Sequence, residues 1–137
     1  MDNHKITARF DSGSSFISTI DQHSLTMDAS AISSEGLGPS PKKLMLAALA
    51  GCTGIDVVSI LEKMKVEFTD LNISVNAALK EEHPRIYKTV DVLFEIKINE
   101  NDRPKMEKAV ALSKDKYCGV SAMFKTFAQV NWTINYL

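Results

Sequence analysis

The sequence predicts a single α+β domain in which a curved antiparallel sheet packs on a long central helix. Three observations lead to this fold class. Several segments alternate apolar and polar residues with period 2, as strands do. One long apolar stretch follows Ser40-Pro41 without a further proline, which is typical of a buried helix. The chain has 137 residues, enough for one core but too few for two, so one domain is expected over 1–137.

The first part of the chain is expected to form a three-stranded meander, with turns at Asp11-Ser12-Gly13 and Asp21-Gln22. The predicted strands cover residues 4–10, 14–20 and 23–28. Ile6, Ala8 and Phe10 alternate with polar neighbours, which indicates a half-buried strand. Residues 29–40 are rich in Ser, Gly and Ala and are expected to form a loop.

The central helix is expected to begin at Ser40-Pro41, with Ser as N-cap and Pro in the first turn. It should extend to about Met64 and be about 35 Å long at 1.5 Å per residue. Its first half, residues 44–52, carries no charge on any face. A helix that is apolar all round is buried all round, and one small subunit cannot surround it. An obligate homodimer is therefore expected.

Two further strands are expected over residues 71–79 and 90–98, joined by Glu81-Glu82-His83-Pro84 as an antiparallel hairpin. Asp102 should then cap a helix that ends near Tyr117. A short helix should follow, and a last strand alternates over residues 130–136. The predicted order is βββ-α-ββ-αα-β. The residues expected on the inner side of the first of these two helices are Met106, Ala109, Val110 and Ser113.

Composition excludes several classes of function. A formal charge of -1 argues against nucleic acid as a partner. No uninterrupted apolar run of about 18 residues occurs, so no membrane span is expected. The segment Met1–Lys5 has no apolar region typical of a signal peptide. Two cysteines are too few for a secreted disulfide scaffold, which favours reduced thiols in the cytoplasm.

The two cysteines allow both a structural and a chemical interpretation. Cys52 lies within the most apolar part of the central helix, where a buried thiol often only fills space and has a raised pKa. Cys118 lies near the start of the short helix, where backbone N–H groups and the helix dipole favour a thiolate. Lys114 and Lys116 add positive potential, which Asp115 partly cancels. Both cysteines belong to elements of one core, so an approach of the two sulfurs is reasonable.

No metal or cofactor site is expected. His4, His23 and His83 show no ligand spacing with each other or with the cysteines. Gly51 and Gly54 lie inside the predicted helix, where they favour close packing, so no glycine-rich phosphate loop is present.

Several motifs resemble those of the OsmC/Ohr family, the osmotically inducible and organic hydroperoxide resistance proteins. The motifs are Gly38-Pro39-Ser40-Pro41, Leu44, Ala47-Ala48, Gly51-Cys52, Ile55-Asp56-Val57-Val58 and Tyr117-Cys118-Gly119-Val120. Glu82-His83-Pro84-Arg85 is similar to a hairpin of an OsmC-like branch, and the resemblance covers nearly the whole chain.

This resemblance implies an intertwined homodimer with two active sites at the subunit interface. It also implies that cysteine reduces organic hydroperoxides or hydrogen peroxide. Cys52 would be the peroxidatic residue that becomes sulfenic acid, and Cys118 would resolve it as a disulfide. An external dithiol would then reduce the disulfide. In the family, an Arg–Glu pair stabilises the thiolate.

The sequence departs from the family at this activating pair. Lys42 and Lys43 stand where the family has its carboxylate, and Arg9 is the sole arginine in the N-terminal strands. An alternative function is therefore a non-catalytic dimer that binds a small apolar or anionic ligand in the interface cavity.

Overall fold

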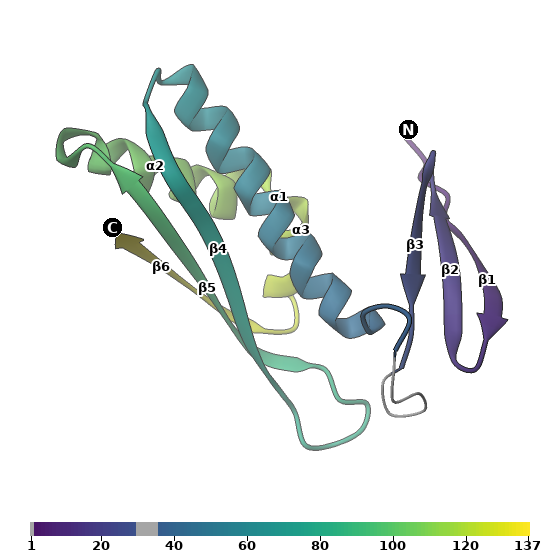
Figure 1. Ribbon diagram of the computed structural model, residues 1–137. Coiled ribbons are helices and arrows are strands. Elements are labelled where there is room, and N and C mark those ends of the chain that lie inside the picture. Colours follow the sequence, from purple (N-terminus) through teal and green to yellow (C-terminus); the bar gives the residue numbers. More distant parts are fainter. Residues whose placement is uncertain (1, 30–35) are drawn as a thin grey trace. The chain divides into compact units, whose positions relative to one another are not determined.

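The computed structural model describes residues 2–29 and 36–137, which divide into two compact units at Leu46 and Ala47. The observed element order is the predicted βββ-α-ββ-αα-β (Figure 1). The expected loop over residues 29–40 falls partly on residues 30–35, which lie outside the described residues.

The N-terminal unit contains the predicted three-stranded meander. Its strands are β1 (Thr7–Ser12), β2 (Ser15–Ile20) and β3 (His23–Met27), paired antiparallel in the order β1-β2-β3. β1 is exposed along its whole length, which differs from the half-buried strand predicted from its alternation. Phe10 and Phe16 contact each other edge to face with ring centroids 5.7 Å apart, but they stay 61% and 44% exposed, so this contact does not bury the strand.

Helix α1 (Pro41–Lys63) begins at the predicted proline, and the Leu44 N–H donates to the Ser40 carbonyl at 3.1 Å. Its buried residues recur every four positions and so form one stripe along the helix. These fully buried residues are Leu49, Thr53, Val57 and Leu61.

The opposite side of α1 is exposed in the single chain, with Ile55 at 73% exposure. A single chain therefore does not bury this helix all round, which is what the sequence led us to expect of one small subunit. Helix α1 is long enough, and with a mean hydropathy that reaches 2.0 apolar enough, to cross a membrane. The absence of an uninterrupted apolar run had led us to expect no such helix. A core helix meets the same test, and the buried stripe on α1 indicates that role.

The C-terminal unit contains a sheet of β4 (Phe68–Leu79), β5 (Tyr87–Ile98) and β6 (Gln129–Tyr136), in the order β4-β5-β6. β4 and β5 form the predicted antiparallel hairpin. β6 pairs parallel to β5, so this sheet is mixed and not wholly antiparallel as predicted. The reason is that the helices between them carry the chain back to the starting end of β5, as a parallel crossover requires.

Three helices pack on the inner face of this sheet (Figure 1). Four alternating residues of β5 are at most 1% exposed, namely Val90, Val92, Phe94 and Ile96, whereas Ile98 at the end of the strand is half-buried. A Cβ added to Gly54 of α1 would lie 2.9 Å from the Cδ1 atom of Ile73 on β4, so glycine permits the close approach of the helix to this strand. On β5, Tyr87 stacks on Phe124 with ring centroids 6.4 Å apart.

The segment between β5 and β6 differs in detail from the two predicted helices. It contains a short 3₁₀ turn (Glu100–Asp102), α2 (Arg103–Leu112), a π-helical turn (Ser113–Tyr117) and α3 (Gly119–Lys125). Asp102 precedes α2 but makes no capping hydrogen bond through its side chain. Met106, Ala109, Val110 and Ser113 are buried as predicted.

Candidate thiol site

The structure brings Cys52 and Cys118 together in the C-terminal unit, although 66 positions separate them in the sequence. Both cysteines are free thiols. Their sulfur atoms and a carboxylate oxygen of Asp56 all lie within 4.8 Å of one another. The predicted approach of the two sulfurs is therefore confirmed.

Asp56 joins the site because it follows Cys52 by four residues on α1. Residues four apart on a helix lie one above the other on the same face. The Ser113 hydroxyl donates a hydrogen bond of 3.0 Å to the Asp56 carboxylate and so links α1 to the π-helical turn. Asp56 was not among the predicted site residues. The i, i+4 spacing from Cys52 was the signal that could have found it.

The π-helical turn positions Cys118. The Cys118 N–H donates to the Ser113 carbonyl at 2.8 Å, five residues earlier. Such π turns are rare and often lie at functional sites. Cys118 then occupies the N-cap of α3, where its sulfur accepts a hydrogen bond of 3.2 Å from the Ser121 N–H. The predicted place of Cys118, at the start of the short helix, is confirmed.

The environment of Cys118 favours the protonated thiol. Its side chain is 3% exposed, and this burial is the chief cause that raises the pKa of Cys118 from 9.0 to about 11. A hydrogen bond with Cys52 and the charge of Asp56 raise this pKa further, whereas the Ser121 N–H lowers it. The prediction that the helix terminus favours a Cys118 thiolate is wrong in its net direction, because desolvation outweighs one backbone N–H.

This raised pKa predicts a loss of stability at alkaline pH. The folded state holds the Cys118 proton more tightly than the unfolded state, so its stabilisation is complete below pH 9 and is lost as pH rises to about 11. Relative to Cys118→Ala, the free energy of unfolding should fall by about 2 kcal/mol over that range. Urea denaturation of both proteins at several pH values measures this difference. Parallel pH profiles would contradict the prediction.

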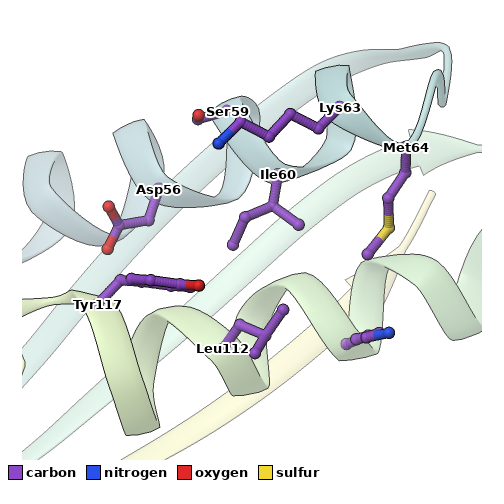
Figure 2. A pocket seen from close by; sticks show the side chains of 8 residues that line it. Asp56, Ser59, Ile60, Lys63, Met64, Leu112 and Tyr117 are labelled. Carbon is purple, nitrogen blue, oxygen red and sulfur yellow. The ribbon is translucent and has the colours of Figure 1, made fainter.

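A pocket with a volume of about 520 Å³ lies beside the thiol pair, between α1 and the segment of α2 and the π-helical turn. Figure 2 shows Asp56 and Tyr117 at one end of this pocket, and Tyr117 directly precedes Cys118. Ile60 lies beyond Asp56 in the same view. The pocket therefore combines an apolar wall with charged groups. Its lining residues are Asp56, Ser59, Ile60, Lys63, Met64, Lys108, Leu112 and Tyr117.

The side chains of Cys52, Asp56 and Cys118 also form a group of potential metal ligands. Thiolate and carboxylate groups both bind Zn²⁺, and their ligand atoms lie within 4.8 Å of one another. Sequence spacing predicted no metal site, because these ligands come from two distant segments. Chelator controls therefore belong in any assay of the thiols.

The fold and the site together indicate one class of protein: an α+β domain with a half-buried thiol on its central helix next to a buried thiol at the start of a late short helix. The chain belongs to the OsmC-like protein family, whose sequence profile matches residues 34–133. Protein YhfA of Escherichia coli strain K12 is 33% identical over 114 residues, which cover 83% of this chain and 81% of YhfA.

Two solved structures illustrate the shared fold. A hypothetical protein from Aquifex aeolicus VF5 is 28% identical, with a TM-score of 0.82 over 100% of this chain and 99% of that protein. The organic hydroperoxide resistance protein OhrB of Bacillus subtilis is 22% identical, with a TM-score of 0.66 over 98% of each chain. The resemblance to the OsmC/Ohr family predicted from the sequence motifs is thereby confirmed.

Proposed function

We propose that this protein is a thiol-dependent peroxidase that reduces organic hydroperoxides or hydrogen peroxide through Cys52 and Cys118. The observation that carries the proposal is the pair of free thiols, whose sulfur atoms lie within 4.8 Å of each other and of Asp56. The structurally similar OhrB is named an organic hydroperoxide resistance protein, and we extend peroxide chemistry to this chain as a proposal.

The proposed cycle has three steps. The Cys52 sulfur attacks the O–O bond, which releases an alcohol or water and leaves a sulfenic acid. The Cys118 sulfur then attacks the sulfenic sulfur, so that an S–S bond forms, the S–O bond breaks and water leaves. An external dithiol reduces the disulfide by thiol–disulfide exchange and is itself oxidised.

Exposure supports this assignment of roles. Cys52 is half-buried in the single chain, whereas Cys118 is 3% exposed. A peroxide can therefore approach Cys52 more easily than Cys118. The raised pKa of Cys118 also suits a thiol that reacts second, because it stays protonated at neutral pH.

Steady-state turnover tests the proposal. The protein, treated with a chelator, is mixed with dithiothreitol and either cumene hydroperoxide or hydrogen peroxide. Peroxide consumption should match dithiol oxidation one to one and exceed the reaction without protein. Consumption at the protein-free rate with both peroxides would overturn the proposal.

We also propose that the functional unit is a soluble, cytoplasmic homodimer in which the exposed side of α1 contacts the second copy. The side chain of Ile55 is 73% exposed there, on a helix with mean hydropathy 2.0. Water contact along such a surface is unfavourable, and a second copy would bury it.

Ile55→Lys is expected to convert the dimer to monomers, because a lysine in an apolar interface loses its hydration. Size-exclusion chromatography with light scattering measures the mass. On a free surface the same change alters stability by about 0.5 kcal/mol or less and leaves the mass unchanged. Glu62→Lys, at an exposed position on the same helix, is the control. A wild-type monomer would contradict the dimer.

One observation favours the second candidate function, ligand binding without catalysis. Lys63 and Lys108 line the 520 Å³ pocket together with apolar side chains, which suits a small amphipathic anion. Two results together would favour this candidate over the peroxidase. Octanoate would bind in a calorimetric titration, and the thiols would form no disulfide under peroxide. Rapid disulfide formation without octanoate binding would exclude it.

A further inference from the structure

We propose that Asp56 is the base that accepts the thiol proton of Cys118 when the disulfide forms, with Ser113 as the residue that positions its carboxylate. This inference rests on the proposed peroxidase cycle and concerns its second step. The family's carboxylate position before the first cysteine holds Lys42 and Lys43 in this chain. Asp56 provides a carboxylate from a different position.

The geometry suits proton transfer. A carboxylate oxygen of Asp56 lies within 4.8 Å of the Cys52 and Cys118 sulfur atoms, a distance that one side-chain rotation or one water molecule can bridge. The hydrogen bond of 3.0 Å from the Ser113 hydroxyl occupies Asp56 Oδ2. Because a carboxylate has several acceptor positions, Oδ1 stays available for a thiol proton.

The step needs a base because Cys118 holds its proton. Burial raises the pKa of Cys118 to about 11, so the thiol stays protonated at neutral pH. A thiol is a poor nucleophile, and the thiolate is the reactive form. The negative charge of Asp56 itself contributes to the raised pKa. Asp56 therefore does not stabilise a resting thiolate and acts only if it takes the proton during the attack.

Protons and electrons balance in this step. The Cys118 sulfur attacks the Cys52 sulfenic sulfur while its proton moves to the Asp56 carboxylate. The S–O bond breaks, and the departing hydroxide takes the proton from Asp56 and leaves as water. Cys118 is oxidised, the sulfenic sulfur is reduced, and Asp56 returns to its charged form.

Other titratable side chains lie around the Asp56 carboxylate. Lys63 on α1, Lys108 on α2 and Tyr117 of the π-helical turn line the same pocket as Asp56. These three groups are the same in wild type and in Asp56→Asn, so the two proteins are compared with each other at each pH.

The variant Asp56→Asn shows whether Asp56 acts as a base or only as a nearby negative charge, because the two roles predict opposite effects on the rate of disulfide formation. Loss of the charge alone lowers the Cys118 pKa and should speed disulfide formation. Loss of a base should slow it by about 100-fold or more at pH 7. This deficit should shrink as pH rises to 9, because a larger share of Cys118 is then already the thiolate.

The experiment is a single turnover of the reduced protein with one equivalent of cumene hydroperoxide, quenched at intervals and analysed by mass spectrometry. Sulfenic acid should form on Cys52 in the variant and accumulate before the disulfide. Equal or faster disulfide formation in Asp56→Asn would overturn the inference. Absence of any oxidation in wild type would instead refute the proposed function itself.

Two further variants complete the test. Glu67→Gln removes an exposed carboxylate that directly precedes β4, and it should leave disulfide formation unchanged. Ser113→Ala keeps the Asp56 carboxylate but releases its hydrogen bond, so a smaller slowing is expected. Should Asp56→Asn fail to fold, unchanged kinetics in Ser113→Ala between pH 6 and 9 would count against the positioned base.

Discussion

Replacement of Cys52 by serine is expected to reduce peroxide turnover to the rate without protein. Serine has nearly the same size and shape, so the half-buried position on α1 should tolerate it. A hydroxyl is a far weaker nucleophile toward O–O bonds than a thiolate. The measurement is steady-state consumption of cumene hydroperoxide with dithiothreitol, together with a melting curve that shows an unchanged fold.

Cys118→Ser is the matched control for this variant. It should still form one sulfenic acid on Cys52 with the first equivalent of peroxide, and a diketone such as dimedone should trap it. Disulfide formation within the chain is then impossible, so excess peroxide should drive Cys52 to sulfinic acid. Full turnover by Cys52→Ser, or loss of the first sulfenic acid in Cys118→Ser, would contradict the assigned roles.

Phe94→Ala is expected to destabilise the folded protein by about 3–5 kcal/mol, the usual cost of removing a large aromatic residue from a core. Phe94 is fully buried, and its ring stacks on Trp132 with centroids 6.2 Å apart. It pairs with Ile73 on β4 and Ile134 on β6, so the cavity would lie at the centre of the sheet. Urea denaturation measures the change.

Thr133→Ala is the control for this loss, because Thr133 is exposed on the opposite face of β6. It should change stability by about 0.5 kcal/mol or less. A cost at Phe94 no larger than that at Thr133 would show that this sheet face is not the centre of the core.

Most of the fold could be predicted because the strands of the C-terminal sheet alternate cleanly. The strand predicted over residues 90–98, which lies within the observed β5, followed from period 2 alone. The direction of β6 could not be predicted in this way, because alternation fixes which residues face the core but not which way a strand runs. The exposure of β1 was also missed, since an alternating apolar pattern does not say which surface covers the strand.

The site was only partly predictable for a related reason. The two sulfurs come from distant segments, and the family motifs around Cys52 and Cys118 indicated their approach. Asp56 was overlooked as a site residue, although its i, i+4 spacing places it on the same helix face as Cys52. Its hydrogen bond with Ser113 is a tertiary contact that the sequence does not reveal. The pKa direction at Cys118 was wrong because helix-terminus arguments are local, whereas desolvation depends on everything packed around the thiol.

Peptide mapping of the oxidised protein tests most directly whether the two thiols act as one redox pair. Reduced protein receives one equivalent of cumene hydroperoxide, free thiols are alkylated, and the digest is analysed by mass spectrometry without reductant. We expect a cross-linked peptide that joins Cys52 to Cys118 within one chain, reversed by dithiothreitol. Both cysteines recovered as alkylated thiols, or a disulfide between two chains, would contradict the pairing.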